Sequence, residues 1–276
     1  MGLKGEVNTM RRQPIRFVTF LAPNMRPVYQ RIAQAVGQRL RRETTLEVGA
    51  SFDVFARSEA DVGFICGLPY VELARQEPPP VVPLAAPVLQ GERYGGQPIY
   101  FSDVVVVRAS PHHAFADLRG RSWAYNDPDS HSGYNITRYT LVRMGETRGF
   151  FGAVVAAGFH QRALRMVARG QVDASAIDSQ VLAIELRDHP DLVARVRVIK
   201  ALGPATIQPI VAARQVSVAL RDDLRAALCA LGDDPGLRDA LDYGYIARFV
   251  PIEDAAYDDI RAMVATAEAA DFLTLR

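Results

Sequence analysis

Cysteine is scarce in this chain: Cys66 and Cys229 are the only two among 276 residues. Two thiols are too few for the disulfide framework of a small secreted domain, and their wide separation does not match the spacing of a zinc site. Both are expected to be buried thiols. The sequence therefore predicts neither a disulfide scaffold nor a metal centre.

Long hydrophobic runs are missing as well. Apolar stretches such as 104–107 (VVVV) are far shorter than the ~20 residues that a membrane-spanning helix needs. Near the start of the chain, the apolar residues after the basic pair Arg11 and Arg12 are interrupted by Arg16 and Thr19, and no small-residue cleavage site follows. No secretory signal peptide is recognised. The chain as given is therefore expected to be cytoplasmic and not to insert into a membrane.

An excess of charge of either sign is also absent. Lys and Arg number 32 against 31 Asp and Glu, which gives a formal net charge of +1. A nucleic acid or an anionic membrane surface is held by many like charges, which this composition does not provide. We expect no nucleic-acid partner, and any anion has to be bound by local groups.

The sequence motifs of several enzyme classes are missing too. There is no G-x-S-x-G, no H-E-x-x-H, no C-x-x-C and no Gly-rich nucleotide loop of the P-loop or Rossmann type. Because these motifs are missing, the sequence predicts no catalytic residue, no metal ligand and no cofactor. The composition, 49% hydrophobic and 23% charged, is that of an ordinary globular chain with one sizeable core or two smaller ones.

Short strand patterns alternate with amphipathic helix patterns, which indicates an α/β fold. The apolar, β-branched run 100–108 is expected to be a strand buried on both faces. After residue 213 only helical patterns are found, at 220–231 and 252–273. The expected strands are 15–20, 45–49, 61–67, 81–89, 100–108, 122–126, 172–177, 196–200 and 207–213.

The order of these elements predicts two lobes. The α/β pattern restarts after a crossing near Arg108, and the chain returns near Gly203, so that the second unit is inserted into the first. We predict a discontinuous first lobe, 1–107 plus 204–276, and an inserted second lobe, 108–203. A cleft between two such lobes is a common ligand site, and closure around the ligand is its usual motion.

The segment 123–139 carries the clearest chemical pattern. A predicted strand ends at Asn126, a turn follows, and Ser130, His131, Ser132 and Gly133 lead into a helix. The free amides and partial positive charge of a first helical turn can bind an anion, and hydroxyls, an imidazole and a close backbone can complete the site. The alternative is that Ser130 or Ser132 only caps the helix.

A second polar group follows farther along the chain. His160 begins a predicted helix, and a strand pattern then delivers Asp178 and Ser179 at its carboxyl end. Ligands of open α/β sheets bind outside the carboxyl ends of strands, which predicts that Asp178 and Ser179 face the same cleft as Ser130. Taken alone, His160 is also compatible with an ordinary surface or hydrogen-bonded histidine.

Two motifs together, DPDSHSGY at 127–134 and GFHQRALRMVARGQVDASAIDS at 158–179, resemble the phosphate, phosphite and phosphonate-binding proteins of ABC importers. The resemblance covers roughly residues 15–213 and implies the type 2 periplasmic binding protein fold, with two mixed sheets flanked by helices and a cleft between them. It implies a periplasmic location, an ABC permease as partner and no cofactor. The resemblance implies that Ser130, His131 and Ser132, with the first-turn amides, bind the anion together with His160. It implies Asp178 at an amino group of the ligand and Tyr70 of GLPY as an aromatic wall. Gly133, from the turn pattern, and Ser179, from the sheet topology, complete the predicted ligand-binding residues.

The sequence departs from that family at two points. His131 stands where the family often has a small hydroxyl residue, which introduces an imidazole whose charge changes near neutral pH. No signal peptide is recognised. We expect a monomeric solute-binding protein that captures a small phosphate-, phosphonate- or similar anion-bearing ligand without covalent chemistry. The alternative is a cytosolic enzyme or ligand sensor on the same fold that acts on a small anionic metabolite.

Overall fold

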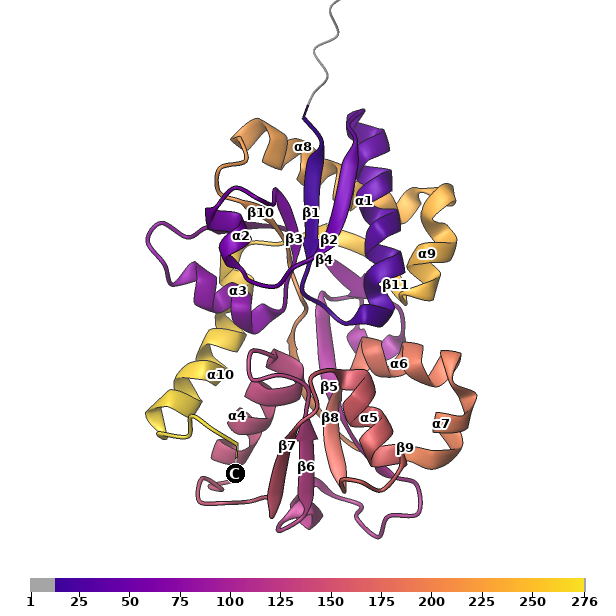
Figure 1. Ribbon diagram of the computed structural model, residues 1–276, viewed down its shortest axis with the longest axis vertical. Helices are drawn as coiled ribbons and strands as arrows, with labels where there is room; N and C mark the ends of the chain where they lie inside the picture. Colours follow the sequence, from indigo (N-terminus) through magenta and orange to yellow (C-terminus); the bar gives the residue numbers. More distant parts are fainter. Residues whose placement is uncertain (1–12, 276) are drawn as a thin grey trace, which may run out of the picture.

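The computed structural model describes residues 13–275, which form two α/β lobes, one above the other in Figure 1. The sheet of the first lobe has the strand order β11-β4-β10-β3-β1-β2. β1 runs parallel to β2 and β3, whereas β10 is antiparallel to β3 and β4, and β11 is antiparallel to β4. These strands are β1 (Ile15–Thr19), β2 (Thr44–Val48), β3 (Val62–Phe64), β4 (Val81–Leu89), β10 (Ile210–Ala213) and β11 (Ile246–Pro251).

The second lobe is built on a five-stranded sheet of order β7-β6-β8-β5-β9. β6 is parallel to β7 and β8, and β5 is antiparallel to β8 and β9. Both sheets are mixed and flanked by helices, so the predicted two-lobe α/β fold is confirmed. The strands are β5 (Ile99–Val107), β6 (Ser122–Tyr125), β7 (Ala153–Ala156), β8 (Ala174–Asp178) and β9 (Val196–Thr206).

The helices follow the apolar periodicity of the sequence. In the first long helix, α1, Pro27 stands in the first turn and Val28, Ile32 and Val36 lie on the buried face. It ends at Arg41, whose φ of 51° breaks the helical path. The helices are α1 (Arg26–Leu40), α2 (Asp53–Ala56), α3 (Gly67–Ala74), α4 (Ile136–Arg143), α5 (His160–Ala168), α6 (Ser179–Asp188), α7 (Pro190–Arg195), α8 (Val218–Cys229), α9 (Arg238–Tyr243) and α10 (Asp258–Ala269).

Two strands differ from the sequence-based expectation. β11 lies in the C-terminal region that was expected to be only helical, where it pairs with β4 at the edge of the first sheet. β7 was not predicted; it is an edge strand of four residues, three of them exposed, and this surface position gives it no buried apolar pattern. Both are short edge strands that are stabilised by pairing with a partner far away in sequence.

The sheets also differ from the boundary predicted at residue 107. β5 is buried as expected, but it pairs with β8 and β9 and so belongs to the second lobe. The chain therefore crosses between lobes just before Ile99, and it returns after Thr206. An apolar strand fits either sheet, and its pairing depends on partners almost a hundred residues later.

The C-terminal end of the chain also lies on the second lobe, although 204–276 was predicted as part of the first. Figure 1 shows α10, in yellow, running along the side of the molecule toward α4. Past α10, the carbonyl of Leu273 accepts a hydrogen bond from Arg138, and the Leu275 N–H donates to the hydroxyl of Tyr134. The described end of the chain thus forms a third connection between the lobes.

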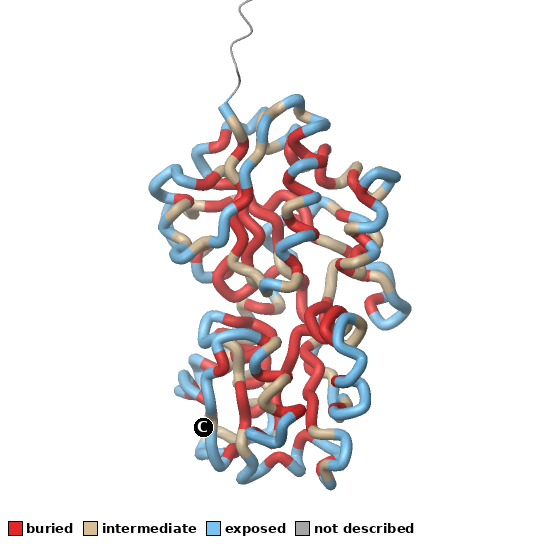
Figure 2. The backbone as a smooth tube through the Cα atoms, turned by 45° about the vertical axis from the view of Figure 1, so that its right-hand side comes forward, coloured by how far each residue is buried: buried red, intermediate tan, exposed pale blue. Residues whose placement is uncertain are grey.

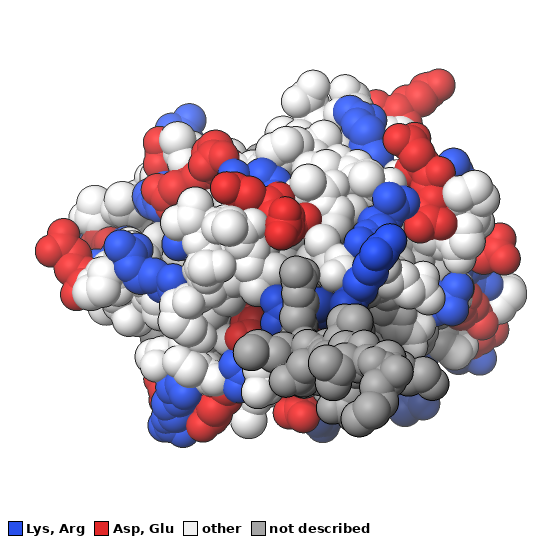
Figure 3. Space-filling model, turned by 90° about the horizontal axis from the view of Figure 1, so that it is seen from above, with Lys and Arg blue, Asp and Glu red and all other residues white. Residues whose placement is uncertain are grey.

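The core extends through both lobes and their junction, as the buried segments in Figure 2 show. In the second lobe the fully buried Trp123 stacks on Phe151 with ring centroids 4.7 Å apart. On the face shown in Figure 3, basic and acidic side chains are intermixed, in keeping with the balanced composition. Between residues 13 and 275, no helix has both the length and the apolar character that crossing a membrane requires.

Candidate ligand site between the lobes

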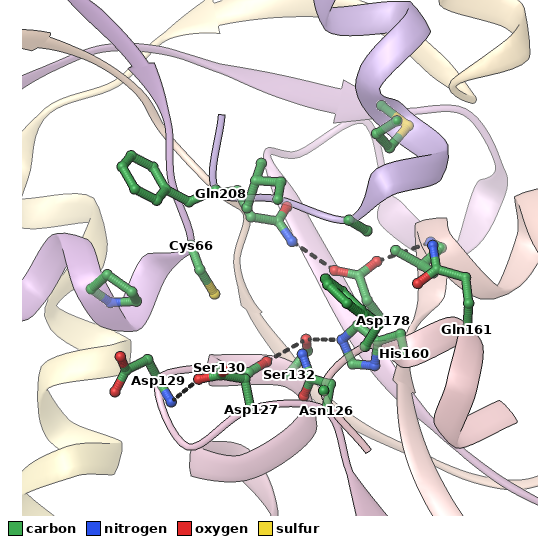
Figure 4. Close-up of a pocket in the computed structure, with 18 of the residues that line it drawn as sticks. Cys66, Asn126, Asp127, Asp129, Ser130, Ser132, His160, Gln161, Asp178 and Gln208 are labelled. Carbon is green, nitrogen blue, oxygen red and sulfur yellow. Dashed lines mark hydrogen bonds between the residues drawn. The ribbon is translucent and has the colours of Figure 1, made fainter. Parts of the chain in front are cut away.

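A cavity of about 270 Å³ lies between the lobes. The second-lobe wall is polar and comes from the end of β6 and the starts of α4 and α5; its residues include Asn126, Asp127, Asp129, Ser130, Ser132 and His160. The first-lobe wall is largely apolar and includes Phe20, Leu21, Met25, Tyr29, Phe52 and Pro69. Figure 4 shows the polar side chains that meet here.

Ser130 and Ser132 both line the cavity, as predicted, and they have different partners. Ser130 is the N-cap of the single π-helical turn His131–Asn135 that leads into α4, and its Oγ accepts the Gly133 N–H at 3.1 Å. The Ser132 Oγ lies 3.4 Å from the Ser130 Oγ and 2.9 Å from the Nε2 of His160. Ser130 therefore caps the helical turn, as the alternative predicted, whereas Ser132 does not.

His160 is the first residue of α5 and lines the same cavity. Burial lowers its pKa to about 3, so its imidazole is neutral at physiological pH. Its Nδ1 has no hydrogen-bond partner among the described residues. A neutral imidazole has one donor and one acceptor nitrogen, so His160 has one ring nitrogen bonded to Ser132 and one still free.

His131 does not line the cavity, contrary to expectation. Its side chain is fully buried inside the second lobe, where Nδ1 lies 3.2 Å from the Asn135 amide nitrogen. Burial lowers its pKa to about 3, which removes the pH-dependent charge that the sequence suggested for this position. Only its backbone N–H points toward the first lobe, where it donates to the Sγ of Cys66.

Gly133 is not among the lining residues either, but the structure explains why it is glycine. A Cβ at this position would stand 1.8 Å from the Oδ1 of Asn126 and 3.2 Å from the Cε1 of His160. Any side chain would therefore displace two residues of the cavity wall. The close backbone approach expected of Gly133 takes place behind the wall rather than inside the cavity.

Asp178 lines the cavity at the carboxyl end of β8, as predicted, and its oxygens already have partners. Oδ1 accepts the N–H groups of Gln180 and Val181 at the start of α6, and Oδ2 accepts the side-chain amide of Gln208 at 2.6 Å. Burial raises the Asp178 pKa to about 6 in spite of these bonds. The carboxyl group is thus close to half-protonated at mildly acidic pH.

Ser179 and Tyr70 lie outside the cavity, which corrects both predictions. The Ser179 Oγ accepts the Phe101 N–H and lies 3.1 Å from the Tyr94 hydroxyl, because the first turn of α6 directs it away from the cleft. Tyr70 is a residue of α3 and faces the C-terminal region, where its hydroxyl donates to Asp254 at 2.5 Å.

Aromatic side chains at other positions wall the cavity instead. The Phe20 and Phe52 rings lie 4.3 Å apart on the first lobe, and Phe159 stands at the second-lobe rim. Cys66 and Gln208 also line the cavity and were not predicted. Cys66 follows β3, so the carboxyl-end rule applied to Asp178 would have found it, whereas Gln208 stands in a crossing segment that gives no such signal.

Among residues 13–275, no Lys or Arg lines the cavity, although Asp127, Asp129 and Asp178 do. The donors for an anion come from the start of α5. α5 begins at the cavity, and no side-chain oxygen caps it. Its first-turn N–H groups therefore provide donors for an anion without formal charge.

Two α/β lobes with a cavity between them, lined by hydroxyls, a neutral imidazole and helix starts, define a two-lobe solute-binding protein. The family model described as ABC transporter, phosphonate, periplasmic substrate-binding protein matches residues 19–257, and the chain belongs to this family. The predicted family is confirmed. The chain is thus a substrate-binding component of an ABC importer, which the match favours over the enzyme or sensor alternative.

Solved structures with similar folds include several binding proteins. A binding protein component of an ABC phosphonate transporter from Pseudomonas aeruginosa has a TM-score of 0.81 at 16% identity, covering 94% of this chain and 88% of that one. PhnD1 from Prochlorococcus marinus in complex with methylphosphonate has a TM-score of 0.80 at 16% identity, over 94% and 98% of the two chains. XAC2383 from Xanthomonas citri bound to ATP has a TM-score of 0.71 at 17% identity, over 95% and 99%.

Members of this family bind a small ligand, work with an ABC permease and are periplasmic. The cytoplasmic expectation receives no support from it. That expectation depended in part on Arg11 and Arg12, which lie outside the described residues.

Proposed function

We propose that this protein captures a small molecule with a phosphonate or phosphate group in the inter-lobe cavity and delivers it to an ABC permease. The observation that carries the proposal is the Ser132–His160 hydrogen bond at the starts of two helices inside the cavity. Ser130, Ser132 and His160 would contact the anion. The lobes would close over it by bending at the crossings before Ile99 and after Thr206.

An anion can be bound here without a cationic side chain. A phosphonate oxygen accepts hydrogen bonds from hydroxyls and from the first-turn amides of α5, and bonds to a charged acceptor are stronger than neutral ones. His160 orients the Ser132 hydroxyl through its Nε2, whereas its Nδ1 is buried away from the cavity. A site of this kind favours small anions over polyanions, because it offers oriented dipoles at one place rather than a field.

Asp178 would form a hydrogen bond with the ligand either in its protonated or in its ionised state. With its pKa near 6, the protonated carboxyl can donate to an oxyanion, and the ionised form can accept from an amino group of the ligand. Acidification below pH 6 would strengthen the first contact and weaken the second. The pH dependence of affinity therefore distinguishes the two.

The Ser132–His160 pair has the distance of a nucleophile and its base, but it lacks the third group that such a pair needs. In serine hydrolases the second histidine nitrogen is held by a carboxylate, and here the Nδ1 of His160 has no partner in the described part of the chain. We therefore propose binding without covalent chemistry, by a monomer that takes up no nucleic acid.

Isothermal titration calorimetry with methylphosphonate, phosphite and phosphate tests this function. At least one of them should bind saturably at one site per chain, and ³¹P spectra of the mixture should stay unchanged over time. The Ser132→Ala variant should lose most of the affinity. No binding by any of the three to a folded sample, or the appearance of a new phosphorus signal, would contradict the proposal.

A further inference from the structure

The two walls of the cavity differ in character. The second-lobe wall carries the hydroxyls, the imidazole and the carboxylates, whereas the first-lobe wall is formed mainly by Phe20, Phe52, Met25, Leu21 and Pro69. Cys66 also lines the first-lobe side, across from Ser130 in Figure 4. A ligand that fills the cavity thus meets polar groups on one side and apolar groups on the other.

The cavity is larger than an anionic group alone requires. A cavity needs roughly 10–15 Å³ to hold one water-sized group, so the five non-hydrogen atoms of methylphosphonate need about 50–75 Å³ and the ten of phenylphosphonate about 100–150 Å³. The cavity measures about 270 Å³. An anion held at the hydroxyls and the α5 start of the second-lobe wall leaves the remaining space toward the apolar first-lobe wall.

Aromatic rings line the cavity on both lobes. The rings of Phe20 and Phe52 lie 4.3 Å apart on the first lobe. On the second lobe, Phe159 immediately precedes His160 and is 57% exposed, so its ring surface is open to contact with a ligand. A flat apolar group beside the anion would cover Phe159 and fill the space.

The cavity lining offers few partners for a second charged group in the ligand. No Lys or Arg of the described part of the chain lines the cavity, so a second anionic group would meet Asp127 and Asp129 without a cation from these residues. Both of these carboxylates are exposed at the mouth, where solvent screens their attraction for an amino group. Asp178, the buried carboxyl, already has three donors from Gln180, Val181 and Gln208.

We infer that the ligand carries an uncharged apolar group about the size of an aromatic ring next to its phosphonate or phosphate group. That group packs between the Phe20–Phe52 pair and Phe159 while the anion sits at Ser132 and His160. This inference rests on the proposed function and adds the substrate class to it.

Calorimetry with three matched phosphonates tests it: methylphosphonate, phenylphosphonate, and 2-aminoethylphosphonate, which has an ammonium group in place of the ring. Phenylphosphonate should bind about tenfold more tightly than methylphosphonate, because it buries ring surface. Phe159→Ala and Phe52→Ala should each lower the affinity for phenylphosphonate much more than the affinity for methylphosphonate, and so remove most of this difference. Val198→Ala, at an exposed apolar residue of β9 outside the cavity, is the control and should preserve the difference.

The outcomes separate the two proposals. If methylphosphonate or 2-aminoethylphosphonate binds as tightly as phenylphosphonate, or if Phe159→Ala leaves the preference intact, the inference is overturned and the proposed function stands. If none of the three binds to folded protein, the proposed function fails and the inference fails with it. Since Phe159 is largely exposed, its replacement tests the inference even if Phe52→Ala does not fold.

Discussion

The Oγ of Ser132 and the Nε2 of His160 lie 2.9 Å apart, although 28 residues separate them in the sequence. Ser132 belongs to the turn that starts α4, and His160 is the first residue of α5. Their bond holds the starts of two helices side by side. Before α4 the His131 and Gly133 N–H groups already have acceptors, so the free first-turn amides at this place come from α5. An anion bound at this place interacts with both helix dipoles at once.

Replacing Ser132 by alanine should lower the affinity for methylphosphonate by about tenfold or more, because a hydrogen bond to a charged acceptor contributes roughly 1.5–3 kcal/mol. The free energy of unfolding should fall by only about 1 kcal/mol. Calorimetry and urea denaturation measure the two effects. Ser175→Ala is the matched control: its hydroxyl is also buried in the second lobe, but it has no hydrogen-bond partner among residues 13–275 and does not line the cavity. Equal losses in both variants would show that Ser132 acts through the fold alone.

Acidification should destabilise the protein through His131 and His160. Burial lowers both pKa values from 6.5 to about 3, so below pH 6.5 the unfolded chain takes up protons that the folded chain does not. Asp178 opposes this: its pKa is raised to about 6, so its contribution to stability increases as pH falls through 6. Two histidines outweigh one carboxyl, and the free energy of unfolding should fall on the order of 1–3 kcal/mol between pH 7 and 5.

Urea denaturation at pH 7, 6 and 5 measures this dependence. In His131→Gln, one of the two protonation sites is gone and the slope of stability against pH should become shallower. A stability that is flat or rises from pH 7 to 5 would contradict the neutral state assigned to the histidines.

Gly133→Ala should destabilise the second lobe by about 1–3 kcal/mol, as overpacking does, because the new Cβ would overlap the Oδ1 of Asn126. Ligand affinity should fall as well, since Asn126 and His160 both line the cavity. The double variant Asn126→Ala/Gly133→Ala removes the clashing group and should recover part of the stability in urea denaturation. If the two substitutions simply add, the clash is not the cause.

The sequence predicted most of the strands, helix starts and site residues that have a recognisable local pattern. The strands from β1 to β6, the helix start at Ser130, and the positions of His160 and Asp178 follow from apolar periodicity, caps and the carboxyl-end rule. Pairing partners and side-chain direction could not be predicted in this way. β5 fits either sheet by composition, and His131, between two cavity residues, points into the core because neighbours on a helical turn face different sides.

The aromatic wall shows the same difference between pattern and arrangement. Tyr70 follows a glycine and a proline after β3, a plausible place for a cleft residue, but it lies on the far side of α3 with its hydroxyl on Asp254. Phe20 and Phe52 stand after two separate strands, β1 and β2, and meet only because these strands are parallel neighbours. A contact of this kind cannot be predicted from the local sequence around either residue.

Cys66 offers a direct measure of occupancy, since its thiol lines the cavity. Burial raises its pKa, so little thiolate is present at neutral pH and alkylation by iodoacetamide should be slow in the free protein. In a Cys229→Ser background, saturating methylphosphonate should slow the reaction at Cys66 further, because the bound ligand and closed lobes block access to Sγ. Mass spectrometry of the modified chain follows the rate, and protein fully alkylated at Cys66 should no longer bind. A rate that saturating ligand leaves unchanged would mean that the anion binds elsewhere, because nothing can occupy the space between Cys66 and Ser130 without shielding the thiol.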